Sequence, residues 1–306
     1  MTGGDEGTVA SLGERFGVPG AVSFETGPGG LVRVVVTIPS AVGHVYLHGA
    51  HVTHYQSTGA PLLFTSPRSQ FVAGRAIRGG VPVIFPWFGP RADAPSAPEH
   101  GFARIAEWSV ESVIRTDDGS VAVVFGLDAT DATRAAWPHA FHLQHRVVFG
   151  KHLEMELEVE NRSRTPFTFE EALHTYLLVG DVRQVTVLGL EGATYIDKLD
   201  GMKRKVHGDA GLRPSGPTDR VFVDTHAACT VEDPVLGRRV IVEKSNSATT
   251  VVWNPWSEKA KAMADLGPDA WQSMLCVEAA NAADDAVRLA PGERHRMTVV
   301  LRIEAA

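Results

Sequence analysis

The stretch that decides the fold class is Leu-Glu-Met-Glu-Leu-Glu-Val, residues 153–159. Its apolar side chains alternate with glutamates, which predicts a strand with one face in the core and the other in water. Short apolar segments of the same style recur along the chain between turns rich in Gly, Pro, Asn and Asp. We expect further strands at residues 31–38, two within 43–56 that are broken at Gly49, and others at 107–113, 121–127, 167–178, 182–188, 239–243, 249–253, 274–277 and 297–303.

Many short strands without alternating long amphipathic helices predict an all-β protein, a large antiparallel β-sandwich. Asp117-Asp118-Gly119 is a hairpin signal between two of the strands. We expect few and short helices, at residues 9–16 and 257–266, the second ending at Gly267-Pro268. No repeat, low-complexity block or linker divides the chain, so we expect residues 1–306 to form a single domain, with residues 1–20 as a short N-terminal lead-in.

The composition excludes several classes of protein. The 306 residues are 44% hydrophobic and 21% charged, as in a globular protein with an ample core. A net charge of −7 argues against nucleic-acid or membrane-surface binding, and no apolar run is long enough to span a bilayer. The first residues lack the features of a signal peptide, and the two cysteines, Cys229 and Cys276, make no disulfide framework. We expect a monomer with free thiols in the cytoplasm.

A second stretch organises the candidate site. It reads Ile-Arg-Gly-Gly-Val-Pro-Val-Ile-Phe-Pro-Trp-Phe-Gly-Pro at residues 77–90 and, after a spacer, Pro-Glu-His-Gly-Phe-Ala-Arg at 98–104. Its glycines and prolines exclude a helix or an ordinary central strand, while its apolar residues are too many for a solvated loop. It is either a rigid site wall that holds Arg78, His100 and Arg104, or a crossover that only packs.

Metal and nucleotide signatures are weak. His48, His51 and His54 are spaced by three, which scatters them over both faces of a strand, and a second histidine triplet at residues 139–145 has the same spacing. Neither cysteine belongs to a Cys-x-x-Cys pair, and no glycine-rich phosphate loop precedes a helix. We therefore expect neither a metal nor an organic cofactor.

Two residues could carry acid and base chemistry. His174 lies in a strand pattern shortly after Glu170 and Glu171, where it is either a hydrogen-bonded core residue or a catalytic group. Glu278 follows the apolar run Met-Leu-Cys-Val and precedes two alanines. This setting predicts either a structural ion pair or a carboxylate whose raised pKa suits a general base.

Six ordered motifs, spread from about Gly43 to Ile303, resemble the aldose 1-epimerase (galactose mutarotase-like) superfamily and, within it, the hexose-6-phosphate 1-epimerases. The motifs are Ile-Arg-Gly-Gly-Val-Pro-Val-Ile-Phe-Pro-Trp-Phe-Gly at 77–89, His-Gly-Phe-Ala-Arg at 100–104, Glu-Ala-Leu-His-Thr-Tyr at 171–176, Tyr-Ile-Asp-Lys at 195–198, Trp-Asn-Pro-Trp with the following Ser-Glu-Lys-Ala-Lys-Ala-Met-Ala-Asp-Leu-Gly at 253–267, and Cys-Val-Glu-Ala-Ala-Asn at 276–281. Together these motifs are specific, although each one alone is weak.

The resemblance implies a galactose mutarotase-like supersandwich with an open cleft on one sheet. It implies that His174 and Glu278 are the catalytic pair. It also places five residues around a sugar phosphate substrate, namely Arg78, Glu99, His100, Arg104 and Asp197. One position departs from the family, where glutamine stands in place of Glu99. A carboxylate there suits a sugar hydroxyl but repels a phosphate.

The residue types fit the interconversion of α and β anomers. Glu278 would remove the proton of the C1 hydroxyl and protonated His174 would protonate the ring oxygen, so that the ring opens and recloses on the other face. Arg78 and Arg104 would hold a 6-phosphate, while His100 and Asp197 orient hydroxyls. Two alternatives stay open. One is a mutarotase for unphosphorylated aldoses, and the other is a non-catalytic carbohydrate-binding module that uses Trp87, Trp253 or Trp256.

Overall fold

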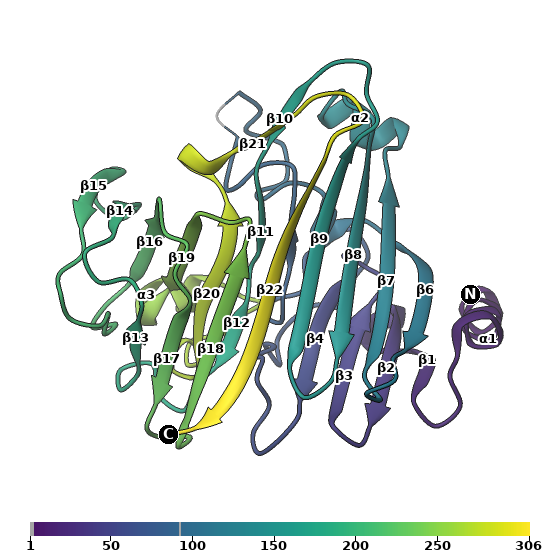
Figure 1. Ribbon diagram of the computed structural model, residues 1–306, viewed down its shortest axis with the longest axis horizontal. Helices are drawn as coiled ribbons and strands as arrows, with labels where there is room; N and C mark the ends of the chain where they lie inside the picture. Colours follow the sequence, from purple (N-terminus) through teal and green to yellow (C-terminus); the bar gives the residue numbers. More distant parts are fainter. Residues whose placement is uncertain (1–2, 92) are drawn as a thin grey trace.

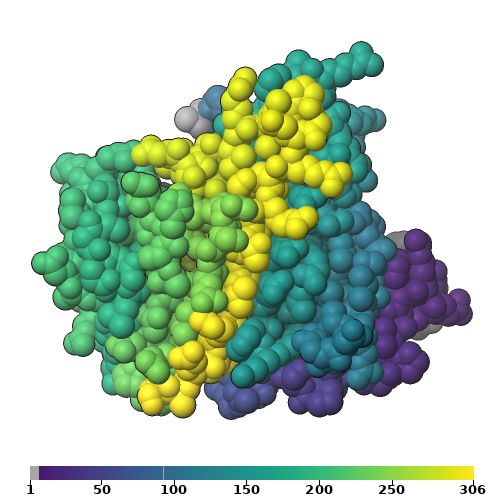
Figure 2. All heavy atoms as spheres, in the orientation of Figure 1, coloured from purple at the N-terminus to yellow at the C-terminus, as the bar shows by residue number. Residues whose placement is uncertain are grey.

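The computed structural model describes residues 3–91 and 93–306 and shows the expected antiparallel β architecture (Figure 1). Two eight-stranded sheets dominate it. The first, here called the front sheet, has the order β13 (Thr186–Leu188), β17 (Cys229–Asp233), β18 (Arg238–Ser245), β22 (Arg294–Ala305), β9 (Leu153–Asn161), β8 (Phe141–Phe149), β7 (Val121–Asp128) and β6 (Ser109–Arg115). Figure 2 shows its C-terminal strand β22, in yellow, crossing the outer face between green and teal segments.

The second eight-stranded sheet, here called the site sheet, carries the candidate functional residues. Its order is β15 (Lys203–Val206), β14 (Thr194–Asp197), β16 (Thr218–Phe222), β19 (Thr249–Asn254), β20 (Met274–Asn281), β11 (Glu171–Leu173) and β5 (Val83–Ile84), and β12 (Tyr176–Leu178) also pairs with β20. A four-stranded sheet contains β1 (Val22–Thr26), β2 (Val32–Ile38), β3 (Ala41–Tyr46) and β4 (His51–Gln56), and β10 (Phe167–Phe169) pairs with β21 (Val287–Leu289).

Helices are few and short, as predicted. They are α1 (Gly3–Phe16), α2 (Asp131–Ala136), α3 (Trp256–Ala262) and the 3-10 turns Pro28–Gly30, Ala103–Ile105, Ala270–Ser273 and Ala283–Asp285. The helix expected at 257–266 ends at Ala262, and α1 begins earlier than the expected residue 9. In the described part of the chain, no helix has the length and apolar character needed to cross a membrane.

The decisive strand behaves as its alternation predicts. Leu153, Met155, Leu157 and Val159 are buried in the main core. The glutamates between them lie on the outer face and form ion pairs with arginines of the neighbouring strands β8 and β22, such as Arg146 with Glu154 and Glu156. The front sheet therefore has one apolar and one charged face.

The inner face of the front sheet covers both other large sheets. The Tyr55 hydroxyl of the four-stranded sheet donates to the carbonyl of Gly150 beyond β8. Arg238 of β18 donates to the carbonyl of Leu178, at the end of β12 of the site sheet. One main core fills the space between these layers.

Two expected elements differ from the structure. The strand predicted at 167–178 is three short strands, of which β10 joins β21 while β11 and β12 pair with β20. The Glu170 carboxylate explains the first break, because it accepts the backbone N–H groups of Phe88 and Ala283 from two other segments. The strand predicted at 182–188 begins only at Thr186. Strands β1, β5, β8, β14, β15, β16, β17 and β21 and helix α2 were not predicted.

The stretch at residues 77–104 is the shaped connection that its composition predicts. Val81 bridges to Val52 of β4, residues 83–84 form β5, and Phe85 bridges to Gly101. The stretch thus joins the four-stranded sheet to the site sheet and then folds back on itself. Its apolar residues Val81, Val83, Ile84 and Phe85 are fully buried.

Candidate active site

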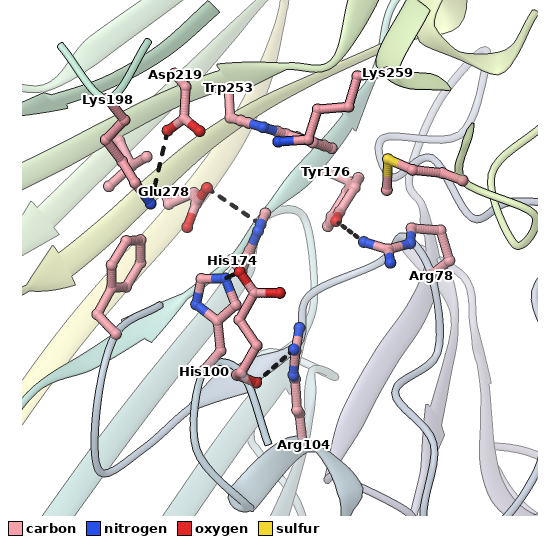
Figure 3. Close-up of a pocket in the computed structure, with 14 residues that line it drawn as sticks. Arg78, His100, Arg104, His174, Tyr176, Lys198, Asp219, Trp253, Lys259 and Glu278 are labelled. Carbon is pink, nitrogen blue, oxygen red and sulfur yellow. Dashed lines mark hydrogen bonds and ion pairs between the residues drawn. The ribbon is translucent and has the colours of Figure 1, made fainter. Parts of the chain in front are cut away.

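A pocket opens on the site sheet and collects side chains from segments far apart in sequence (Figure 3). The 77–104 stretch, the β11–β12 junction, β16, β19, β20 and the region around α3 all contribute to it. Its lining consists of Arg78, Phe88, Glu99, His100, Arg104, His174, Tyr176, Lys198, Asp219, Val251, Trp253, Lys259, Met263 and Glu278. Of the seven residues predicted for the site, only Asp197 is missing from this lining.

Strand register brings His174 and Glu278 together. Leu173 lies opposite Ala279, and Tyr176 lies opposite Cys276. The same register, continued through the break between β11 and β12, sets residue 174 opposite residue 278. Cross-strand neighbours share one face of a sheet, and here the Nδ1 atom of His174 lies 3.3 Å from Oε1 of Glu278.

Strand alternation explains why this carboxylate faces the pocket. Val277 and Ala279 lie in the main core, whereas Ala280 lies in a smaller apolar cluster with Val251, which lines the pocket. Glu278 points to the same face as Ala280 because side chains alternate along a strand.

Both members of the pair are withdrawn from water. His174 is 7% exposed and Glu278 is 1% exposed. Burial raises the pKa of Glu278 well above its ordinary value, and the charge of Asp219 acts in the same direction. Burial lowers the pKa of His174 well below its ordinary value, and His100, Arg104 and Arg78 add to this. His174 Nδ1 and Glu278 Oε2 are buried and make no hydrogen bond to the described residues.

Two guanidiniums lie on the Tyr176 side of the pocket. Arg78 donates from Nε to Asp265 Oδ2 at 3.0 Å and from Nη1 to the Tyr176 hydroxyl at 3.1 Å. Arg104 donates from Nη2 to the backbone carbonyl of Glu99 at 2.6 Å. Burial lowers the pKa of Arg104, since its surroundings compensate its charge only in part. An anionic ligand would complete that compensation.

His100 is held as a neutral imidazole. Its Nδ1 accepts the backbone N–H of Gly89 at 3.1 Å, which places the ring proton on Nε2. Burial lowers its pKa to about 2, with Arg104 and Lys198 acting in the same direction. His100 therefore offers an N–H donor to the pocket near Glu99, whose Oε1 lies 3.8 Å from Nε2.

Asp197 is not where the resemblance implies. Its carboxylate accepts hydrogen bonds from Lys205 at 2.7 Å and from the backbone of Leu199, and the Lys205 bond is the largest cause of its lowered pKa. The next residue, Lys198, lines the pocket instead, because neighbouring side chains on a strand point to opposite faces. We therefore do not keep Asp197 in the site.

Asp219 is the acid that the structure brings to the pocket. It lies on β16, 4.0 Å from the ammonium of Lys198, and burial raises its pKa. In Figure 3 this pair lies on the opposite side of His174 and Glu278 from the two arginines. No motif marked Asp219. Lys198 belongs to the motif Tyr-Ile-Asp-Lys at 195–198. Knowing which face of β14 is turned toward the pocket would have identified Lys198 in place of Asp197.

The segment 256–266 supplies further residues that the sequence analysis did not assign. Lys259 lies over the Trp253 ring, with its Nζ 5.6 Å from the ring centroid, and Met263 completes the wall. Trp253 itself is 9% exposed and Trp87 is 8% exposed. The third candidate, Trp256, is partly buried, and its ring centroid lies 4.4 Å from that of Trp271. The three rings therefore do not form the exposed aromatic platform that the binding-module alternative requires.

One group within the described residues brings three conceivable metal ligands together. His174, Cys276 and Glu278 each offer one ligand atom, and these three atoms lie within 4.8 Å of one another. Burial raises the pKa of the Cys276 thiol well above its ordinary value, which opposes the thiolate that a metal needs. The nearby guanidiniums also repel a divalent cation. The arrangement is better suited to proton transfer.

Comparison with known proteins gives consistent matches. The sequence model described as "Aldose 1-epimerase" matches residues 37–302. A Salmonella typhimurium protein named "Putative glucose-6-phosphate 1-epimerase" is 36% identical over 246 residues, covering 80% of this chain and 81% of its own. A protein of the same name from Cenchrus ciliaris is 32% identical over 284 residues, covering 90% and 85%.

Solved structures agree with the fold. The crystal structure of a Salmonella typhimurium protein described as "a putative mutarotase" superposes with a TM-score of 0.87 at 32% identity, covering 94% of each chain. A galactose mutarotase-like protein from Clostridium acetobutylicum gives a TM-score of 0.73 at 16% identity, covering 93% of this chain and 98% of its own. The second match supports the fold alone. The predicted galactose mutarotase-like sandwich is thereby confirmed.

Proposed function

The chain belongs to the aldose 1-epimerase family, and we propose that it interconverts the α and β anomers of a hexose 6-phosphate, with glucose 6-phosphate as the first candidate. The observation that carries the proposal is the buried His174–Glu278 pair, 3.3 Å apart, in a pocket that also holds Arg78 and Arg104. The matched relatives named for glucose 6-phosphate support this substrate. The protein is then an isomerase.

The pair is suited to move one proton in each direction. Burial raises the pKa of the carboxyl and lowers that of the imidazole, so the Glu278 carboxylate is a stronger base and protonated His174 a stronger acid than the same groups in water. The pair shares one proton, and the reactive form carries it on His174. Glu278 takes the proton of the C1 hydroxyl while protonated His174 gives its proton to the ring oxygen. The C1–oxygen ring bond breaks, the aldehyde rotates about C1–C2, and the ring closes with the two roles exchanged.

The positive charges of the pocket recognise the phosphate. Arg78 and Arg104 supply planar donors that match phosphate oxygens, and both lie on one side of the pair. On the other side, Asp219 and Lys198 can bind sugar hydroxyls, as can the N–H of His100. Glu99 carries a side chain that is 62% exposed, so we place it at a hydroxyl near the pocket mouth, away from the phosphate.

Anomer equilibration tests the proposal directly. Freshly dissolved α-glucose 6-phosphate is followed by NMR with and without the protein, and the protein should accelerate the approach to the equilibrium mixture. Parallel runs with free glucose and galactose test the mutarotase alternative. If no sugar or sugar phosphate equilibrates faster than in buffer, the enzymatic proposal is wrong.

The double change Arg78→Ala with Arg104→Ala separates the phosphate from the neutral substrate. We expect kcat/KM for glucose 6-phosphate to fall by about 100-fold or more, since two charge-assisted contacts are lost, while any activity on free glucose changes far less. Arg183→Ala is the control, because Arg183 pairs with Asp181 at the surface. Equal losses on both sugars would favour the mutarotase for unphosphorylated aldoses. A monomeric state and a cytoplasmic location stay predictions.

A further inference from the structure

Tyr176 connects the two halves of the pocket. Its ring stacks on the His174 imidazole, with the ring centroids 4.8 Å apart and an angle of 11° between the planes. Its hydroxyl accepts the hydrogen bond from Arg78 Nη1 at 3.1 Å. Figure 3 shows Tyr176 between His174 on one side and Arg78 on the other. Tyr176 thus contacts both His174, the proposed acid, and Arg78, which is proposed to bind the phosphate.

The position of Tyr176 is rigid. The side chain is 1% exposed, and its backbone N–H donates to the Gly80 carbonyl at 2.9 Å. The Trp253 ring packs edge-on against it at 6.0 Å, with 74° between the planes. A ring fixed on one face by Trp253 and by its own backbone can hold the imidazole that lies on it in one plane.

Asp265 holds the other side of Arg78. Both Nε and Nη2 of Arg78 lie 3.0 Å from Asp265 Oδ2. The backbone carbonyl of Asp265 in turn accepts the Ser66 hydroxyl at 2.7 Å. The two hydrogen bonds of Arg78 use one N–H group on Nε and one on Nη1, which leaves N–H groups on Nη1 and Nη2 for a ligand. Asp265 belongs to the motif at residues 253–267.

We propose that Tyr176 is a positioning residue with two separable tasks. Its ring fixes the plane of the His174 imidazole for proton transfer to the sugar ring oxygen. Its hydroxyl, together with Asp265, fixes the guanidinium of Arg78 with N–H groups toward the 6-phosphate. The inference rests on the proposed function. The ring of Tyr176 orients the acid His174, and its hydroxyl orients Arg78 for phosphate recognition.

Two substitutions of Tyr176 separate the tasks. Tyr176→Phe keeps the stacked ring and removes the hydroxyl, so KM for glucose 6-phosphate should rise about 5- to 10-fold while kcat stays within about twofold. Tyr176→Leu removes the ring, so kcat should fall about 10- to 100-fold, and Phe at this position should restore it. Asp265→Asn should raise KM as Tyr176→Phe does.

Tyr195→Phe is the matched control. Tyr195 is also a buried tyrosine beside a guanidinium, with Arg220 4.8 Å above its ring, but it lies outside the pocket lining. We expect its kcat and KM to equal those of the unchanged protein. Thermal melting of all variants shows whether each one folds. If Tyr176→Leu folds and keeps its kcat, the assignment of the ring is wrong.

Binding of inorganic phosphate, measured by calorimetry, gives a readout that does not depend on turnover. Tyr176→Phe and Asp265→Asn should each weaken it about 5-fold or more, and Tyr195→Phe should not. Equal phosphate binding by Tyr176→Phe and the unchanged protein would overturn the assignment of the hydroxyl. Failure of the proposed function looks different, because the unchanged protein itself would then not accelerate anomerisation.

Discussion

At the residue scale, Glu278 is an acid in a place that favours its neutral form. Burial is the main cause of its raised pKa, and the cations Lys198 and Arg104 compensate only in part. Such a group costs stability and supplies chemistry, which is the trade-off expected of an active-site residue. The cost can be measured, because it depends on pH.

Glu278→Gln should become more stable relative to the unchanged protein as pH rises. The raised pKa means that the folded protein keeps a proton on this carboxyl above pH 4.5, the ordinary value, while the unfolded chain releases it. The unchanged protein therefore loses stability with rising pH, by roughly 1.4 kcal/mol per pH unit until the folded pKa is passed. Urea denaturation of both proteins between pH 4 and 8 measures this difference.

The same substitution should lower kcat by about 10²- to 10⁴-fold, the range expected for loss of a general base. Sugar phosphate binding should persist, because the arginines are unchanged. A stability difference that stays constant from pH 4 to pH 8 would show that the carboxyl has an ordinary pKa in the folded protein. A variant with full activity would remove Glu278 from the mechanism.

At the element scale, the 77–104 stretch depends on close backbone approach. Gly101 has φ +74°, and a Cβ there would lie 1.9 Å from the carbonyl oxygen of Phe85, to which this glycine bridges. The backbone N–H of the neighbouring His100 donates to the carbonyl of Gly89. Gly101 therefore directly follows the residue whose imidazole lines the pocket, and a larger residue at 101 would collide with Phe85.

Gly101→Ala should destabilise the protein by more than about 3 kcal/mol and raise KM, since both φ and the contact with Phe85 oppose it. Gly74→Ala is the matched control, because Gly74 has φ +76° and nothing within 4 Å of its Cβ position. It should cost only about 1 kcal/mol, from φ alone. The denaturant midpoints of the two variants measure the difference. Equal midpoints would mean that the turn relaxes freely.

At the scale of the whole molecule, charge is distributed unevenly. The chain carries a net charge of −7, yet Arg78, Arg104, Lys198 and Lys259 all line one pocket. These four cations would attract a dianionic sugar phosphate to the pocket. Screening by salt weakens such attraction, since the Debye length falls from about 10 Å at 0.1 M to about 3 Å at 1 M.

Added salt should therefore lower kcat/KM for glucose 6-phosphate, by about 5- to 10-fold between 0.05 and 0.5 M NaCl. Initial anomerisation rates at low substrate concentration measure it. The Arg78→Ala, Arg104→Ala double variant is the control and should lose most of this dependence. An unchanged kcat/KM across the salt series would argue against a phosphate ligand in this pocket.

Much of the molecule follows from local pattern. Alternating segments such as 153–159 predicted strands and the sandwich class, because one buried face imposes a period of two wherever the strand pairs. Glycines and prolines predicted the irregular wall at 77–104 in the same way. Short strands such as β14 and β16 carry too few residues for a clear periodic signal, and Asp219 on β16 was therefore not predicted for the site.

The sequence by itself determined that this is an antiparallel β protein with acid, base and guanidinium groups in specific motifs. Only the tertiary structure decided which of these groups meet. His174 faces Glu278 through the register of β11 and β12 with β20, and Lys198 rather than Asp197 faces the pocket through the pairing of β14. The physical reason is that face and register are set by contacts between strands distant in sequence, and a shift of one residue exchanges the faces.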